Sequence, residues 1–152
     1  MDDRYFEDFS VGERFVSGFL TVTETEISQF RATYDGQLGD SDEARVLDHH
    51  DERRVAASLA YVLAVSFRLF QDTGAIRVCG RGSPGVDQVR YHKPLRAGDS
   101  IQAVGEVTAT RPSKSKPDRG LVDLNLEVRD RREEKVLTYS CKLILAKRSP
   151  SP

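Results

Sequence analysis

The sequence of 152 residues contains only two cysteines, Cys79 and Cys141. Two cysteines are too few for a disulfide framework and do not have the spacing of metal ligands, so we expect neither disulfides nor a metal site. The net charge is only −1, with many charges of both signs, so no overall basic field favours a nucleic acid or a membrane as a partner. The first residues, MDDRYFEDF, are unlike a targeting peptide. These absences predict a reduced, cytoplasmic protein.

The sequence also lacks an uninterrupted apolar run long enough to span a membrane. Its most apolar stretch, Asp51 to Asp72, reads DERRVAASLAYVLAVSFRLFQD and is polar at both ends and interrupted inside. Apolar residues occur on nearly every side of this stretch when it is drawn as a helix, which predicts a helix buried on nearly every side. At about 1.5 Å per residue this helix would be roughly 30 Å long. The rest of the chain must therefore wrap it.

Three segments precede the long helix. Residues Arg14–Val22 read as a strand. Thr23, followed three residues later by Glu26, forms a capping-box pattern and predicts a helix over residues 24–34. The apolar stripe of this helix consists of Ile27, Phe30 and Tyr34. Residues 35–54 are polar and rich in Asp, which predicts an irregular loop, and a polar loop ahead of a buried helix is a natural place for a functional site.

A glycine-rich segment follows the long helix. Residues Ile76–Cys79 read as a short strand, and Gly80–Gly85, GRGSPG, matches the pattern G-x-G-x-x-G. A dinucleotide-binding loop of this pattern must open a helix. Here Pro84 interrupts the segment and the strand-like run Val86–Tyr91 follows it. We therefore predict a glycine turn rather than a nucleotide site.

From Val86 onward, apolar and polar residues alternate with a period of two, which is typical of antiparallel strands with one apolar face. A basic hairpin loop, Arg111–Gly120, joins two of these strands. The predicted inward positions are Ile101, Ala103, Val107 and Ala109 in one strand, Val122, Leu124, Leu126 and Val128 in the next, and Leu137, Tyr139, Cys141, Leu143 and Leu145 in the last.

The apolar faces of these strands need a cover, and the long helix is the only large apolar body available. We therefore predict an α+β protein of the hot-dog fold, in which a curved antiparallel sheet wraps around one long buried helix. A single domain is expected over residues 1–148, followed by a disordered tail at 149–152. Exposed sheet edges would favour a dimer.

Three strings resemble the MaoC-like dehydratase family of hot-dog proteins: YFEDFSVGERF, PLRAGDSI and RPSKSKPDRGLVDLNLEV. The resemblance extends from Tyr5 to Lys147. It implies an (R)-specific enoyl-CoA hydratase or a related dehydratase of acyl thioesters. In that family an Asp and a His five residues apart hold the reacting water, and a backbone N–H at the start of the long helix receives the thioester oxygen. A helix N-terminus suits an oxygen that gains negative charge.

Carried over by this resemblance, Asp35 corresponds to the catalytic Asp of the family, and Asp40 stands where the family has its His. The catalytic motif is thus degenerate. In VAASLAY, the small residues Ala57 and Ser58 are kept, whereas Leu59 replaces a glycine and Tyr61 a histidine. The resemblance implies Asp35 and Asp40 as catalytic residues. It implies Gln37, Ser58 and Leu59 as substrate-binding residues.

Asp35 and Asp40 could divide the chemistry, because one of two close carboxylates tends to stay protonated and act as an acid. They could equally be caps within a solvated loop. His49 and His50 could replace the missing imidazole or simply lie in solvent. Ser58 could bond a thioester or cap the helix.

Basic residues of the Arg111–Gly120 hairpin could bind the phosphates of coenzyme A, or the hairpin could be an ordinary solvated turn. The candidates for phosphate binding are Arg111, Lys114, Lys116 and Arg119, with Lys114 and Lys116 favoured. His92 is expected to be structural.

Three functions remain open. The first is a hydratase or dehydratase of an acyl-CoA or acyl-carrier thioester, acting as a homodimer or heteromer and needing no cofactor beyond the coenzyme A of its substrate. The second is a non-catalytic, thioester-binding subunit of a heteromer with another hot-dog chain. The third is a thioesterase, in which Glu52 near the start of the long helix would direct the water.

Overall fold

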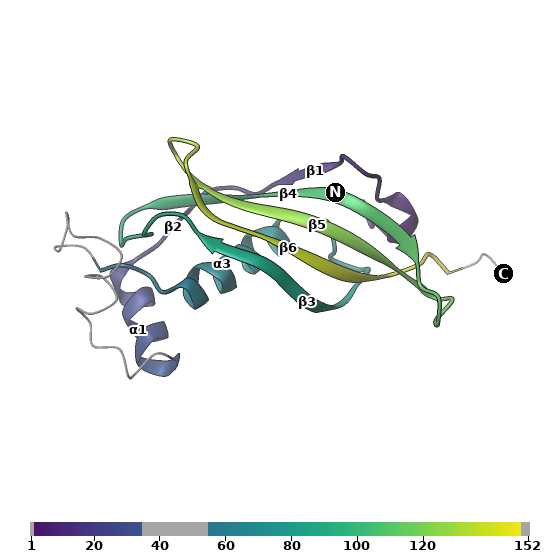
Figure 1. The fold of residues 1–152 in the computed structure, drawn as a ribbon, viewed down its shortest axis with the longest axis horizontal. Helices are drawn as coiled ribbons and strands as arrows, with labels where there is room; N and C mark the ends of the chain where they lie inside the picture. Colours follow the sequence, from purple (N-terminus) through teal and green to yellow (C-terminus); the bar gives the residue numbers. More distant parts are fainter. Residues whose placement is uncertain (1, 35–54, 150–152) are drawn as a thin grey trace.

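The computed structural model describes residues 2–34 and 55–149. Over these ranges a curved antiparallel sheet covers one side of a long helix, as Figure 1 shows. The elements are η1 (Phe6–Asp8), β1 (Arg14–Val16), β2 (Leu20–Thr21), α1 (Glu24–Tyr34), α3 (Leu59–Asp72), β3 (Gly80–Tyr91), β4 (Ser100–Pro112), β5 (Arg119–Asp130) and β6 (Lys135–Ala146). The strand order is β1-β4-β5-β6-β3, with β2 also paired to β4. The predicted α+β hot-dog architecture is confirmed.

Strands β4, β5 and β6 form a meander whose apolar face packs on α3. The alternation predicted from the sequence holds in β5 and β6, whose inward residues are all buried. In β4 it holds for Ile101, Ala103 and Val107, but Ala109, predicted to face inward, is exposed, because the pairing of β4 with β5 shifts register between Val107 and Ala109.

Helix α3 comes very close to the sheet at Gly105 in β4. An added Cβ there would lie 2.9 Å from Cδ2 of Leu126 and 3.0 Å from Cε2 of Phe70. Glycine at this position lets α3 lie directly on the sheet.

The long helix begins later than the sequence predicted. Residues Val55 and Ala57 are extended and pair with a turn ahead of β4: the Ala57 N–H donates to the Leu95 carbonyl at 2.7 Å, and the Ala97 N–H donates to the Val55 carbonyl at 2.9 Å. Ser58 is the N-cap, and its Oγ accepts from the Tyr61 N–H at 3.2 Å. The apolar run before Ser58 is thus buried by sheet-like pairing and not as helix.

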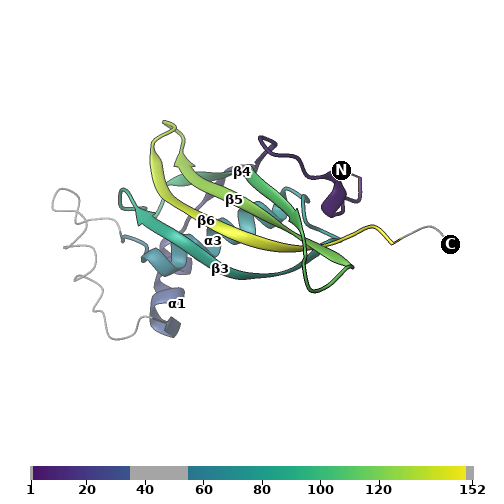
Figure 2. The same cartoon turned by 45° about the vertical axis from the view of Figure 1, so that its right-hand side comes forward.

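The prediction that this helix is buried on nearly every side is also wrong for the described chain. The sheet covers only one side of α3, as the rotated view in Figure 2 shows. Val62, Ser66, Leu69 and Phe70 face the core. The opposite side carries exposed apolar residues, with Leu59 39% and Phe67 38% exposed. Among the helices of the described ranges, none is long and apolar enough to cross a membrane.

The first helix is confirmed with its cap. Helix α1 spans Glu24–Tyr34, and Oγ1 of Thr23 accepts from the Glu26 N–H at 3.2 Å. Ile27 of its predicted stripe is buried, whereas Tyr34 is 71% exposed. The buried stripe therefore covers only the start and middle of α1.

The strand predicted over Arg14–Val22 is interrupted between β1 and β2. The interruption begins at Ser17, whose hydroxyl oxygen accepts from the Ala103 N–H at 2.9 Å. The Ser17 backbone N–H donates to the carbonyl of the same Ala103 at 2.9 Å. The Ser17 hydroxyl therefore replaces a backbone carbonyl as acceptor in the β-ladder, and the strand is divided into the two short strands β1 and β2.

The segment after α3 also differs from its prediction. Residues Ile76–Cys79 form turns, and Gly80–Gly85 belongs to the edge strand β3 instead of a glycine turn. The pairing of β3 with β6 shifts register between Gly80 and Gly82 and again between Gly82 and Gly85. Gly82 has φ +124°, a left-handed value that glycine tolerates. Within this bulge the Ser83 hydroxyl donates to the Lys142 carbonyl at 2.6 Å.

Candidate active site

The N-terminus of α3 presents free backbone donors. Ser58 Oγ accepts a hydrogen bond from the Tyr61 N–H, and the Ser58 carbonyl accepts one from the Val62 N–H at 3.1 Å. Within residues 2–34 and 55–149, the Leu59 and Ala60 N–H groups donate no hydrogen bond. These two N–H groups stand at the positive end of the helix dipole. They can therefore stabilise an oxygen that becomes negatively charged.

The phenol of Tyr91 holds the segment that leads into this helix. Its hydroxyl donates to the Ala57 carbonyl at 2.8 Å and accepts from the Leu95 N–H at 2.9 Å. One side chain of β3 thus links the two paired segments next to Ser58. Sequence reasoning did not single out Tyr91, because both of its partners are backbone groups that only the fold brings near.

Helix α1 packs against the first turn of α3. The rings of Phe30 and Tyr61 meet edge-to-face, with centroids 5.5 Å apart. The Tyr61 hydroxyl donates to Oε2 of Glu26 at 3.4 Å, and Nη2 of Arg31 donates to the Ala56 carbonyl at 2.9 Å. Burial and the nearby Glu26 carboxylate raise the pKa of Tyr61 to about 12. Tyr61 is therefore a neutral hydrogen-bond donor at ordinary pH.

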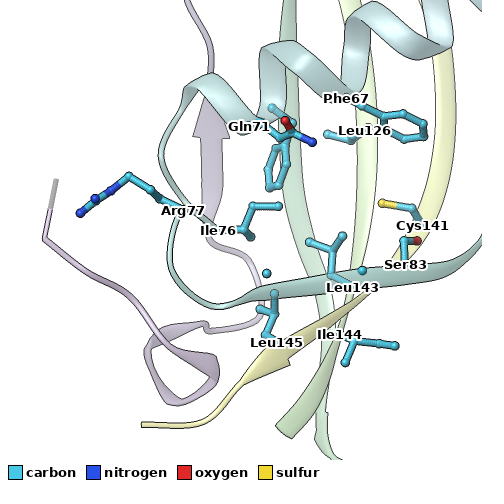
Figure 3. Close-up of a pocket in the computed structure, with 13 residues that line it drawn as sticks. Phe67, Gln71, Ile76, Arg77, Ser83, Leu126, Cys141, Leu143, Ile144 and Leu145 are labelled. Atoms are coloured by element: carbon cyan, nitrogen blue, oxygen red, sulfur yellow. The ribbon is translucent and has the colours of Figure 1, made fainter.

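An apolar cavity of about 580 Å³ lies at the other end of α3. Figure 3 shows it between the last turns of the helix, β3 and β6. Its lining residues are Phe67, Phe70, Gln71, Ile76, Arg77, Gly80, Gly82, Ser83, Leu126, Cys141, Leu143, Ile144 and Leu145. Burial, together with the charge of Asp123, raises the pKa of the Cys141 thiol to about 11, so this sulfur is a neutral part of the wall. A cavity of this size and character suits an apolar ligand group.

The structure does not bring Lys114 and Lys116 near Ser58 and Leu59 within one chain. Both lysines lie on the β4–β5 hairpin, whereas the start of α3 pairs with residues just ahead of β4. Strand β4 has 13 residues, which separates its two ends by about 40 Å. Figure 1 shows this hairpin and the start of α3 at opposite ends of the sheet.

A different group of charges lies at the end of the sheet where α3 begins. Lys93 forms ion pairs with Asp130 and with Glu134, and the second pair measures 2.8 Å. Burial acts to lower the pKa of Lys93, but its hydrogen bonds to the two carboxylates outweigh this and raise that pKa. Lys93 and Asp130 border a cleft of about 500 Å³ that also includes Arg96 and Arg132. Sequence reasoning missed this cleft, because its walls come from two separate turns.

Several predicted site residues lie outside the described residues. These are Asp35, Gln37, Asp40, His49, His50 and Glu52. The segment that carries them starts directly after Tyr34 and ends directly before Val55 in the sequence. His92 is described, and its Nε2 lies 2.7 Å from Oγ1 of Thr138 in the neighbouring strand. In the described ranges no three His, Cys, Asp or Glu side chains are grouped to hold a metal ion.

No family model matches the chain. A segment of 68 residues is 34% identical to the mesaconyl-CoA hydratase of Haloarcula hispanica, covering 44% of this chain and 19% of that protein. The chain therefore matches only about a fifth of the length of this curated relative.

Solved structures are similar over nearly the whole chain. The MaoC-like dehydratase from Rhodospirillum rubrum has a TM-score of 0.81 and 27% identity, covering 97% of this chain and 100% of that one. A monoamine oxidase regulatory protein from Archaeoglobus fulgius has a TM-score of 0.80 and 25% identity, covering 96% of each chain. Rv0216 of Mycobacterium tuberculosis, described as a double hot-dog fold, has a TM-score of 0.78 and 22% identity, covering 98% of this chain and 46% of that one.

More distant structures share the fold. They include the (R)-hydratase from A. caviae, with 15% identity and a TM-score of 0.67 over 93% of this chain and 99% of that one. The HadBC (3R)-hydroxyacyl-ACP dehydratase complex of M. tuberculosis has 14% identity and a TM-score of 0.67 over 88% of this chain and 96% of that one. The resemblance predicted from the sequence is confirmed: the chain is similar to the MaoC-like dehydratases and has the hot-dog fold.

Proposed function

We propose that this chain binds an acyl thioester and acts as an (R)-specific enoyl-CoA hydratase or dehydratase. One observation carries the proposal: the free Leu59 and Ala60 N–H groups open α3, and an apolar cavity lies at its other end. The first feature suits a thioester oxygen and the second an acyl chain. The similarity to mesaconyl-CoA hydratase supports a coenzyme A thioester as the substrate.

In the proposed reaction the thioester oxygen lies at the N-terminus of α3. Water bonds to the β-carbon of the enoyl group, and one water proton passes to the carboxylate of Asp35. Negative charge collects on the thioester oxygen, where the Leu59 and Ala60 N–H groups stabilise it more strongly than they stabilise the neutral substrate. Asp40, initially protonated, then donates its proton to the α-carbon, and transfer of the water proton from Asp35 to Asp40 restores both carboxyl groups. This division of roles replaces the Asp and His of the family with two carboxylates.

The direct test is the hydration of trans-enoyl-CoA by the purified chain. The reaction is measured as the loss of the ultraviolet absorbance of the conjugated thioester. We expect Asp35→Asn to reduce kcat by at least about a hundredfold, as is typical when a general base is removed. Asp72→Asn is the matched control, because Asp72 is an exposed acid at the end of α3 that pairs with Arg68. Release of free thiol would indicate a thioesterase instead. No turnover at any chain length, alone or with a second hot-dog chain, would refute catalysis.

A non-catalytic subunit of a heteromer is the second candidate. The observation that favours it is the edge strand β3, which pairs with β6 on one side and with no other described strand. An open edge can accept a strand of another chain, and the similar HadBC dehydratase is described as a complex. Light scattering of the purified protein would measure its assembly. A fully active homodimer would exclude this second candidate.

A further inference from the structure

Two consecutive backbone carbonyls ahead of α3 are held by side chains from other elements. Nη2 of Arg31, on α1, donates to the Ala56 carbonyl at 2.9 Å. The Tyr91 hydroxyl, on β3, donates to the Ala57 carbonyl at 2.8 Å. Arg31 is only 3% exposed, and Ala56 and Ala57 are fully buried. Because water cannot easily replace a lost donor at such buried carbonyls, these two bonds determine how the peptide groups lie.

The Tyr91 hydroxyl also replaces one backbone hydrogen bond. Ala57 and Leu95 are paired in an antiparallel arrangement, and the Ala57 N–H donates to the Leu95 carbonyl at 2.7 Å. In a regular pair of this kind the Leu95 N–H would donate to the Ala57 carbonyl in return. Here the Leu95 N–H donates to the Tyr91 hydroxyl at 2.9 Å, and that hydroxyl donates to the Ala57 carbonyl. The phenol is therefore inserted between the two segments and sets their separation.

The held carbonyls lie directly before the free donors of α3. The peptide group of the Ala57 carbonyl is followed in the chain by the two that carry the Leu59 and Ala60 N–H groups. Ser58 between them is extended, with φ −70° and ψ 158°, and the helix starts at the next residue. Since each peptide group is planar, a rotation at Ala57 changes the direction of the N–H groups that follow.

We propose that Tyr91 and Arg31 are positioning residues, which hold the Leu59 and Ala60 N–H groups where the thioester oxygen gains negative charge. The inference rests on the proposed function, because it takes that oxygen to lie at the start of α3. Both side chains act through the backbone and not by contact with the substrate. Backbone donors stabilise a developing charge only when they point at it, and a misplacement of about 1 Å can lower a rate by roughly a hundredfold. Loss of either bond should therefore slow the reaction more than it weakens binding.

The first experiment measures kcat and KM of Tyr91→Phe with a trans-enoyl-CoA. This change removes the hydroxyl and keeps the ring. We expect kcat to fall by at least about tenfold while KM stays within about twofold, because the donors move and the rest of the site is kept. Tyr139→Phe is the matched control, since it also removes a buried hydroxyl that bonds to α3, at Ser66 and away from the helix start. Its kcat should stay within about twofold of the wild-type value.

Arg31 provides a second pair of variants, which also tests the proposal if Tyr91→Phe does not fold. We expect Arg31→Met to lower kcat with little change in KM, and Arg31→Lys, which keeps a charged donor, to retain more of kcat than Arg31→Met. Thermal denaturation of every variant measures the accompanying loss of stability. If kcat falls as much in Tyr139→Phe as in Tyr91→Phe, in proportion to the loss of stability, the role of Tyr91 is purely structural and the proposal is wrong.

A second measurement needs no turnover. Acetoacetyl-CoA can lose a proton from its α-carbon to a buffer base, and the resulting enolate carries negative charge on oxygen and has its own ultraviolet absorbance. We expect the wild-type protein to raise the ratio of enolate to neutral form in the bound ligand, and Tyr91→Phe to lower this ratio by at least about tenfold at the same pH. Acetyl-CoA is the matched ligand, because it is much less acidic. Its affinity should be the same for both proteins.

The two measurements separate this inference from hydration. If the wild-type protein stabilises the enolate without hydrating enoyl-CoA, and Tyr91→Phe loses the enolate, the positioning role stands and the proposed hydration fails. If the wild-type protein hydrates enoyl-CoA, and Tyr91→Phe keeps both its kcat and its enolate ratio, the positioning role is wrong and hydration stands. If the wild-type protein does neither, both proposals are wrong.

Discussion

The hydroxyl of Tyr139, on β6, donates a hydrogen bond to Oγ of Ser66, on α3, over 2.7 Å. The direction follows from the second bond of Ser66, whose single hydroxyl hydrogen is donated to the Leu63 carbonyl at 2.6 Å. Both side chains are buried between helix and sheet. This bond fixes α3 on the middle of the sheet within an otherwise apolar layer.

Removal of one partner of this pair should be costly. We expect Ser66→Ala to lower the free energy of unfolding by about 1–3 kcal/mol, because it leaves the buried Tyr139 hydroxyl without an acceptor. Tyr139→Phe should cost less. The double variant should be more stable than the sum of the two single losses predicts. Urea denaturation followed by circular dichroism measures all three, and strictly additive losses would show that the bond contributes nothing.

The stability of the protein should depend on Tyr61 at high pH. Burial and the charge of Glu26 raise the pKa of Tyr61 from 10.0 to about 12. The folded protein thus holds the phenolic proton more tightly than the unfolded chain. The resulting stabilisation is complete below about pH 10 and is lost as pH rises towards 12. Tyr61→Phe should flatten the fall in stability across this window, and the exposed Tyr34→Phe should not. Identical pH profiles for the two variants would contradict this assignment.

Gly105 should be intolerant of even one methyl group. Its added Cβ would lie 2.9 Å from Leu126 and 3.0 Å from Phe70, so Gly105→Ala should cost about 1–3 kcal/mol through overpacking. The control is Gly18→Ala, where no atom lies within 4 Å of the added Cβ. Thermal denaturation compares the two variants. Equal melting temperatures would mean that α3 moves away from the sheet at little cost.

Local patterns predicted most of the fold. The cap at Thr23 and the alternation in β5, in β6 and in β4 as far as Val107 depend on residues close in the sequence, so they could be read directly. The start of α3 could not, because Val55–Ala57 are extended only through pairing with Leu95–Ala97. The same run of apolar residues fits a buried helix and a buried extended segment paired to another strand equally well. The choice between them depends on a partner about forty residues away in the sequence.

The candidate site was predicted in part. The family resemblance indicated Ser58 and Leu59 at the helix start, and they lie there. Tyr91 and the bond between Glu26 and Tyr61 join segments that are distant in the sequence, and no local pattern marks them. The cavity was not predicted either, since it needs the end of α3, the bulged half of β3 and the last strand together.

The strand order has a consequence for how the chain folds as it is synthesised. Strand β3 is made before β4, yet its neighbour is β6, and Gly80 pairs with Leu145. The hairpins of β4, β5 and β6 can form as they emerge, because their contacts are local. Until β6 has been synthesised, the apolar surfaces of helix α3 and strand β3 remain exposed to solvent. We therefore expect the nascent chain to rely on chaperones or on the ribosome surface until β6 has left the exit tunnel.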